Sequence, residues 1–379
     1  MKIAFVVHDY RRREGHSRYV VELATRMAAN NEVHVFANRI EAEGSSNIHF
    51  HHVPAWRASA LGSILSFAVQ ATLRVRGDFD IIHNQGLCGL RGNVFTAHIC
   101  NRAWHRALRH AIGNLTFREW VSGTFLSALE YLFYSNARKA RIIAVSNRVA
   151  RDIRQFYHSS APVSVIYHGV DLDTFSPNAS LRSEVRSACQ LAPEEMVFLF
   201  VGDMRKGARQ CIRALAALPS AKLLFASRSP EAPYRKLAAE LGLERRVLFL
   251  GVTGQVQRYY AASDALLLPT HYDSFAMVVT EAMACALPVI VSREAGASEL
   301  IQSGINGLVL ENFHDSAELA EKMRLLAGNP ELCVRMGAAA RQTMLSHSWD
   351  QVAGRTIEVY RQLLLGERLT ADLKAQHLQ

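Results

Sequence analysis

The stretch Thr270-HYDSFAMVVTEAMACALPVIVS, residues 270 to 292, carries most of the information about the fold. It follows the apolar run Ala265-LLLP and itself contains Pro288-VIVS, and both runs have the length and apolar character of buried strands. Residues 275 to 286 between them form an apolar segment of helical length. A strand, a helix and a second strand in this order predict a unit of a parallel sheet that is covered by helices.

The same alternation of strand and helix runs through the chain in two series. The first series opens with Lys2-IAFVV and closes with Val163-SVIYH, and the second opens with Met196-VFLFVG. Residues 171 to 193 between them have the composition of a linker. A last helix is expected over residues 348 to 365. The pattern predicts two α/β domains, each a doubly wound parallel sheet with helices on both faces.

The composition argues against several other classes of protein. The chain has 379 residues, of which 49% are hydrophobic and 20% are charged, a balance typical of globular domains. Its six cysteines are scattered and none lies in a C-x-x-C pair, so neither a disulfide framework nor a zinc site is expected. The uncharged run between Arg57 and Arg74 contains serines and is shorter than the roughly 20 apolar residues of a membrane span. No secretory signal is visible, and we expect a cytoplasmic protein.

The formal net charge of +9 is unevenly distributed. Residues 1–170 carry 21 lysines and arginines against 11 aspartates and glutamates, whereas the rest of the chain carries 22 against 23. The positive excess of the first half favours an anionic partner, such as a membrane surface, a phosphorylated acceptor or nucleic acid. Solubility alone is the alternative explanation. No recognised nucleic-acid-binding motif is apparent, so we expect no nucleic acid partner.

Ligands of open parallel sheets bind outside the carboxyl ends of the strands. In the second half, the loop Gly202-DMRKG follows a predicted strand and precedes a helix. Arg205 and Lys206 therefore lie beside a helix N-terminus, where two cations would suit a diphosphate group. The alternative is a pair of solvated basic side chains at the tip of a loop.

Asp273 and Glu281 are the two acidic residues of the segment 270 to 292. Asp273 is expected near the N-cap of the helix, and Glu281 lies two turns further on among apolar neighbours. A carboxylate in such surroundings rarely stays buried without a partner, and the hydroxyl groups of a sugar or a ribose would provide one. The alternative is that Asp273 only caps the helix and that Glu281 pairs with an arginine.

The first half offers two weaker candidates. Gly15 opens a predicted helix at a position where the backbone can approach a phosphate. His98 follows the predicted strand Asn93-VFTA, where it could act in proton transfer or as a hydrogen-bond donor. A lone histidine is more often structural, and no H-x-x-x-H or H-E-x-x-H pattern indicates a metal site.

Taken together, these segments resemble the retaining glycosyltransferases of family 4. The hallmark of that family, E-x7-E followed by A-M-A-x-G-x-P-V, corresponds to Asp273-x7-Glu281 and Ala282-MACALPVIVS. Four further segments are similar to its motifs: Gly15-HSRYVVELA, Tyr167-HGVDLDTF, Arg293-EAGASELI and Ser303-GINGLVL. The short loop before Arg205 also resembles that of lipopolysaccharide-core sugar transferases.

The resemblance implies a GT-B fold, which consists of two Rossmann-like domains with parallel sheets that face each other across a cleft. An acceptor-binding domain would span residues 1–168 and a nucleotide-sugar-binding domain residues 169–349. The C-terminal helix, residues 350–379, would return to the first domain. The family's enzymes need no metal ion or cofactor, because basic side chains stabilise the leaving nucleotide.

The resemblance also implies roles for individual residues. Arg205 and Lys206 would hold the donor diphosphate, Glu281 the ribose and Asp273 the transferred sugar, while His98 would line the sugar site. The implied catalytic residues are His98, Asp273, Arg205 and Lys206. The implied donor-binding residues are Gly15, Gly202, Arg205, Lys206, Asp273, Phe275, Ala276, Met277 and Glu281. Asp273 replaces the first glutamate of the motif and Ala276 a glycine, so we expect these two positions to affect the choice of sugar.

The sequence thus predicts a retaining enzyme that transfers a hexose from a nucleotide sugar, with a UDP-sugar the first expectation, to a cell-surface glycan or glycolipid such as lipopolysaccharide core. It would work in the cytoplasm, in peripheral contact with an anionic membrane. Two alternatives remain open at this point. One is a sugar-nucleotide epimerase of the same fold, and the other is an inactive relative that serves as a scaffold.

Overall fold

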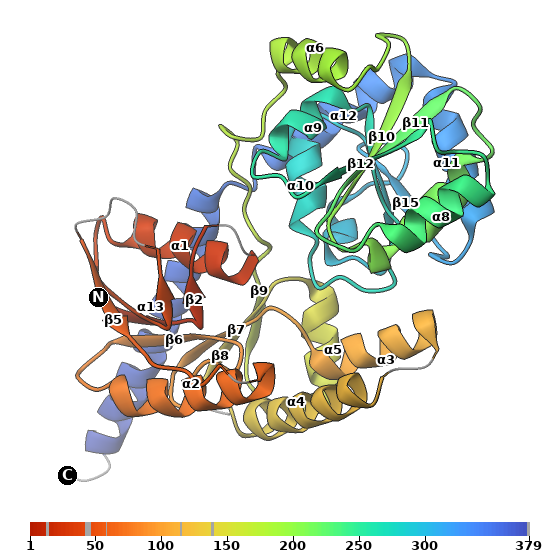
Figure 1. Ribbon diagram of the computed structural model, residues 1–379. Coiled ribbons are helices and arrows are strands. Elements are labelled where there is room, and N and C mark those ends of the chain that lie inside the picture. The colour runs from red at the N-terminus through yellow and green to blue at the C-terminus, as the bar shows by residue number, and fades with distance from the viewer. Residues whose placement is uncertain (13–14, 42–46, 58, 114–115, 138–139, 377–379) are drawn as a thin grey trace. The chain divides into compact units, whose positions relative to one another are not determined.

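The computed structural model describes residues 1–12, 15–41, 47–57, 59–113, 116–137 and 140–376 (Figure 1). The chain divides into two compact units. The first unit comprises Met1–His168 and Trp349–Gln379, and the second comprises Gly169–Ser348. The C-terminal helix α13 (Trp349–Gln376) is therefore part of the first unit.

The first unit is built on a seven-stranded parallel sheet with the strand order β5-β3-β1-β6-β7-β8-β9. The strands are β1 (Lys2–Val6), β3 (Glu32–Ala37), β5 (Ile48–His52), β6 (Ile81–Gln85), β7 (Val94–Ala97), β8 (Arg141–Ala144) and β9 (Val163–Val165). Besides α13, the helices are α1 (Gly15–Met27), α2 (Ala60–Arg74), α3 (Asn101–Ile112), α4 (Phe117–Asn136) and α5 (Asn147–Tyr157). A separate short pair joins β2 (Asp9–Tyr10) to β4 (Arg39–Ile40).

Helices cover both faces of this sheet because its central strands are apolar on both sides. On one face, Phe67 of α2 packs in a cluster with Val6 and Phe36. On the other face, the ring of Phe5 lies 5.4 Å from that of His83, and Nδ1 of His83 lies 2.6 Å from the Tyr360 hydroxyl of α13. Burial lowers the pKa of His83 to about 3, so the ring is neutral in this core.

The second unit holds a six-stranded parallel sheet with the order β12-β11-β10-β13-β14-β15. The strands are β10 (Met196–Val201), β11 (Ala221–Ala226), β12 (Val247–Gly251), β13 (Ala265–Leu268), β14 (Val289–Ser292) and β15 (Leu308–Leu310). The helices are α6 (Ala179–Ala188), α7 (Ala208–Leu215), α8 (Ala232–Glu240), α9 (Gln257–Ala262), α10 (Met277–Ala284), α11 (Ser316–Ala327) and α12 (Pro330–Met344), with 3-10 turns η1 (Met204–Lys206) and η2 (Gly296–Leu300). The predicted α/β class, with parallel sheets in two domains, is confirmed.

Two local predictions are wrong. The segment 171–193 is not a plain linker, because it contains α6, whose first turn is capped by the Asn178 side chain at the Leu181 amide. The predicted helix 275–286 is shorter at both ends, since α10 runs only from Met277 to Ala284. Its start is delayed because Ala276 has a left-handed backbone with φ of 71°. Its end is set by Ala286, whose φ is 59°.

Candidate functional site

In the second unit, the loops after β10 and β13 meet at the carboxyl edge of the sheet. The loop after β10 turns at Gly202 and Gly207, whose φ angles are 116° and 114°. A Cβ atom on Gly207 would lie 2.3 Å from the carbonyl oxygen of Pro269, which directly follows β13. Only glycine meets both demands, the positive φ and the close backbone approach. The close packing of the two loops places Lys206 beside the residues that follow β13.

Lys206 and Asp273 form an ion pair across these two loops, with 2.6 Å between Nζ and Oδ2. Burial of the Lys206 ammonium would lower its pKa, but the charge of Asp273 and its hydrogen bond outweigh this effect, and the pKa is raised. The other carboxylate oxygen of Asp273 accepts the amide hydrogen of Phe275 at 3.1 Å. The structure therefore brings together the two side chains that the sequence analysis proposed for the diphosphate and the sugar.

Arg205 is arranged differently from its neighbour. Its guanidinium donates to Asp203, with 2.7 Å between Nη2 and Oδ2, and 54% of its side chain is exposed. Asp203 also accepts the backbone amide of Arg205 at 2.9 Å. Arg205 is thus paired within its own loop, whereas Lys206 is paired with Asp273 in the loop that leads into α10, so Lys206 is the better placed cation for an anion at that helix.

The N-terminus of α10 lies next to Asp273. Three backbone hydrogen bonds hold the residues before the helix. Asp273 donates to the Glu294 carbonyl at 3.0 Å, Gly296 donates to the Asp273 carbonyl at 2.9 Å, and Ala297 donates to the Phe275 carbonyl at 2.6 Å. No side chain caps α10 among the described residues. The first amide groups of a helix lack acceptors within it, and together with the helix dipole they attract anions. An anion placed here would also lie beside Lys206.

Glu281 is buried in α10, with 7% of its surface exposed. The hydroxyl of Tyr260 in α9 lies 3.1 Å from its Oε2 atom and 3.2 Å from the Val278 carbonyl. Tyr260 is not among the residues predicted from the sequence, because nothing in the local sequence of α9 connects it to a carboxylate that follows 21 residues later. The contact supports a fixed orientation for Glu281, which a ligand hydroxyl would need.

In the first unit, His98 lines a cavity of about 420 Å³. Gly15, His16 and Gln85 line the same cavity, so both sequence-predicted positions of this unit adjoin one space. Nε2 of His98 lies 2.8 Å from Oε1 of Gln85, which requires Nε2 to carry the proton. Burial, reinforced by His16 and His168, moves the pKa of His98 well below its usual value. His98 is therefore a neutral ring whose Nδ1 atom is an acceptor.

A second, apolar cavity of about 780 Å³ lies between α2 and α4. Ile64 and Leu87 line both cavities, so the apolar cavity adjoins the one at His98. Its other apolar lining residues come from α2, the segment between β6 and β7, strand β7, α4 and the residues after α4: Leu65, Ala68, Leu90, Phe95, Leu129, Leu132, Phe133, Ala137 and Ala140. A molecule with a polar head and a hydrocarbon chain could occupy the two cavities together.

Two family models match the chain. The model of glycosyl transferases group 1 matches residues 182–343, and that of Glycosyltransferase Family 4 matches residues 13–174. The chain belongs to the family 4 glycosyltransferases. The resemblance based on the block around Asp273 and Glu281 is thereby confirmed, as is the expectation of a glycosyltransferase.

This glycosyltransferase is similar to curated relatives over most of its length. It is 28% identical to the D-inositol 3-phosphate glycosyltransferase of Streptomyces avermitilis, with 93% of this chain and 84% of the relative covered. It is 27% identical to D-inositol 3-phosphate glycosyltransferase 1 of Catenulispora acidiphila, with 92% and 91% covered.

Solved structures support the GT-B fold. Sucrose-phosphate synthase from Thermosynechococcus elongatus matches with a TM-score of 0.79 and 21% identity, over 96% of this chain and 99% of the other. WaaG, a glycosyltransferase involved in lipopolysaccharide biosynthesis, matches with a TM-score of 0.79 and 20% identity, over 94% and 99%. Anabaena HepE in complex with UDP and glucose matches with a TM-score of 0.72 and 20% identity, over 96% and 100%.

The family motif shows where this glycosyltransferase carries backbone strain. Ala276 and Ala286 occupy motif positions that are glycine in the family pattern, and both have positive φ angles, 71° and 59°. A residue with a Cβ atom pays about 1–2 kcal/mol in this left-handed region. At both ends of α10 an alanine therefore adopts the left-handed backbone conformation that glycine adopts without strain.

We expect Ala276→Gly to stabilise the second unit by about 0.5–1 kcal/mol. The gain is the relief of left-handed strain, about 1–2 kcal/mol, less the greater freedom of glycine in the unfolded chain, about 0.5–1 kcal/mol. Thermal unfolding would measure it. Ala284→Gly, at a right-handed position in the same helix, is the control and should destabilise by about 1 kcal/mol. A loss of stability in Ala276→Gly would show that the left-handed backbone at Ala276 is not strained.

Proposed function

We propose that this glycosyltransferase transfers a hexose, with retention of configuration, from a UDP-sugar to a glycolipid or glycan acceptor such as lipopolysaccharide core. The observation that carries the proposal is the Lys206–Asp273 ion pair beside the uncapped N-terminus of α10. This arrangement combines a cation and backbone donors for a diphosphate with a carboxylate for sugar hydroxyls. The solved complexes of HepE with UDP and with UDP-glucose support a UDP-sugar as the donor class.

In the proposed reaction, the donor lies along the carboxyl edge of the second unit's sheet. Its diphosphate meets Lys206 and the first amides of α10, its sugar meets Asp273, and its ribose meets Glu281. The bond between the sugar and the distal phosphate breaks, and the negative charge that develops on the leaving UDP is stabilised by Lys206 and the helix N-terminus. The acceptor hydroxyl forms the new bond and passes its proton to that phosphate. Positive groups of the chain act here, so the proposal includes no metal ion and no cofactor.

The cavities of the first unit support an acceptor with a lipid part. The cavity at His98 has polar side chains in its lining, among them Asp9, His16 and Asn101, and these could bind the hydroxyl groups of a sugar. The adjoining apolar cavity between α2 and α4 suits a hydrocarbon chain. Burying such a chain would contribute about 0.8 kcal/mol for each methylene group.

The surface of α3 and α4 supports a peripheral membrane location on the cytoplasmic side. Phe117, Trp120 and Leu132 of α4 are 79%, 50% and 60% exposed, and Arg106 and Arg109 are exposed on α3. Within the described part of the chain, no helix has both the length and the apolarity for a membrane span. Aromatic and basic side chains together favour binding at the surface of an anionic bilayer.

Lys206→Ala should reduce kcat for transfer by about 10²–10³-fold, the typical effect of removing one group that stabilises developing charge. Release of UDP in the presence of a glycolipid acceptor would measure it. Lys236→Ala removes an exposed lysine from α8 and is the matched control. A near-normal kcat/KM for Lys206→Ala would refute the role of Lys206.

Substitutions of the two motif carboxylates should separate their roles. Glu281→Gln removes an acceptor for the ribose hydroxyls and should weaken free UDP binding by about 1–3 kcal/mol. Asp273→Asn removes the ionic partner of Lys206, so UDP affinity should be unchanged or higher while sugar transfer falls. Calorimetric titration with UDP compares the two variants. Equal losses of UDP affinity, or none in Glu281→Gln, would show that the roles are misassigned.

The full chain should float with vesicles that contain anionic lipid and not with neutral vesicles, and its binding should fall as salt rises because the attraction is screened within roughly 10 Å at 0.1 M. A double substitution of Phe117 and Trp120 by serine should reduce the bound fraction. Val334→Ser, which changes an exposed apolar residue of α12 in the second unit, should not. Binding that ignores lipid charge and salt would argue against this location.

A further inference from the structure

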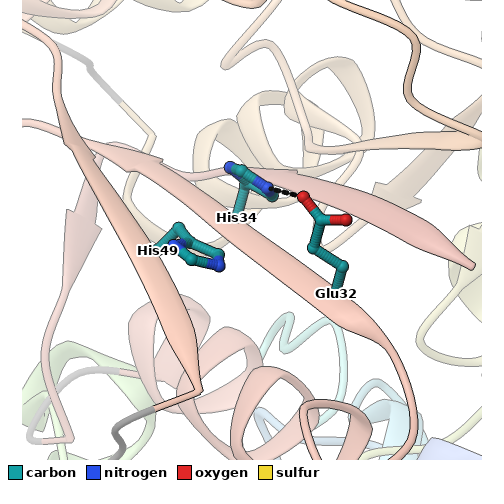
Figure 2. A group of neighbouring side chains, drawn as sticks. All are labelled: Glu32, His34 and His49. Carbon is teal, nitrogen blue, oxygen red and sulfur yellow. Dashed lines mark hydrogen bonds and ion pairs between the residues drawn. The ribbon is translucent and has the colours of Figure 1, made fainter.

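Three potential metal ligands gather on the first unit's sheet: Glu32, His34 and His49. Glu32 and His34 lie two residues apart on β3 and therefore on the same face of the sheet. His49 of the edge strand β5 is the register partner of His34. Figure 2 shows these three side chains next to one another on the two neighbouring strands.

The ligand atoms of this Glu32–His34–His49 cluster are close enough to share an ion. One ligand atom from each residue lies within 4.8 Å of the others. Nε2 of His34 is 2.9 Å from Oε1 of Glu32, and the His34 and His49 rings stack with 4.7 Å between their centres. Small side-chain rotations would bring three such atoms to the roughly 2.0–2.2 Å at which nitrogen and oxygen bind zinc.

The ring of His34 also contacts His51 and Phe79, which fix its orientation. Its Nδ1 atom lies 2.8 Å from Nε2 of His51, the next residue of β5 on the same face. His51 in turn stacks on Phe36 with 4.4 Å between ring centres. The Phe79 ring also packs against His34, nearly perpendicular to it, with 5.1 Å between the ring centres. Histidine ligands of metals characteristically use their second nitrogen in this way, to donate to an outer group that orients the ring.

We propose that Glu32, His34 and His49 bind a divalent transition-metal ion of the Zn²⁺ class, with His51 as the outer partner that orients His34. Two imidazoles and one carboxylate are a donor set that suits zinc and its neighbours in the series, and water completes the tetrahedron. In the metal-bound state the single ring proton of neutral His34 lies on Nδ1, which donates to Nε2 of His51, so the lone pair of His34 Nε2 is available to the ion and the proton of His51 lies on its own Nδ1. Lys2, whose Nζ lies 2.9 Å from Glu32, has to swing aside.

The position of the site shows that it serves something other than transfer. Glu32 is the first residue of β3, so the cluster lies toward the amino ends of the strands, opposite to the edge that carries His98. Glu32 and His49 also line an open hollow of about 690 Å³, through which an ion can reach them. An ion held by β3 and β5 ties the edge strand of the sheet to its neighbour.

The test uses the full chain stripped of metal and titrated with Zn²⁺ and with Co²⁺. We expect one tight ion for each chain, a tetrahedral Co²⁺ absorption spectrum and a rise in Tm with Zn²⁺. His49→Ala and Glu32→Gln should lose the tight ion and the Tm rise. His51→Phe keeps the stacking on Phe36 but removes the acceptor, and it should weaken binding by about 10–100-fold.

His52→Ala is the matched control, because His52 is an exposed histidine of the same strand on the opposite face, and it should bind as the unaltered chain does. Circular dichroism of each variant without metal verifies that the fold is kept. Failure of the unaltered chain to bind Zn²⁺, or equal binding by His49→Ala and His52→Ala, would overturn the proposal.

Discussion

The ion pair between Lys206 and Asp273 is the contact on which the organisation of the second unit's site depends. Its members follow two adjacent strands, β10 and β13, and they meet because Gly207 allows the loop after β10 to lie directly against Pro269. Because the two side chains neutralise each other, a lysine and an aspartate can both be partly buried here without an unpaired charge. In the proposed reaction, a diphosphate at the N-terminus of α10 would compete with Asp273 for Lys206, and the carboxylate would then be available for hydroxyl groups.

The backbone at the start of α10 is strained at Ala276. Asp273 and Phe275 are tied by three backbone hydrogen bonds to residues 294–297, so the chain cannot relax there. The fixed path forces Ala276 into the left-handed region, where glycine would be the natural residue. The resulting geometry leaves the helix N-terminus open to an anion. Stability is given up at the place where the proposed donor would bind, as is common at functional sites.

The first unit places different chemistry at the two ends of one parallel sheet. Its carboxyl edge carries the cavity of His98, which adjoins the apolar cavity between α2 and α4. Toward its amino edge lie Glu32, His34 and His49. The two regions have no described residue in common, since the cavities are lined by neither β3 nor β5. A metal at the amino edge and transfer at the carboxyl edge are therefore separate hypotheses.

The α/β class follows from the sequence alone, because apolar runs of strand length that alternate with helices are buried in parallel sheets covered on both faces. The sequence also placed Lys206 and Asp273 at one sheet edge, since both follow strands of the same sheet. It could not reveal that Arg205 turns to Asp203 or that Tyr260 contacts Glu281, because such contacts depend on loop paths and on helix packing. The two-residue spacings of Glu32 with His34 and of His49 with His51 put each pair on one face of a strand. Only the register between β3 and β5 decided that these faces coincide, and register is set by the packing of the whole sheet.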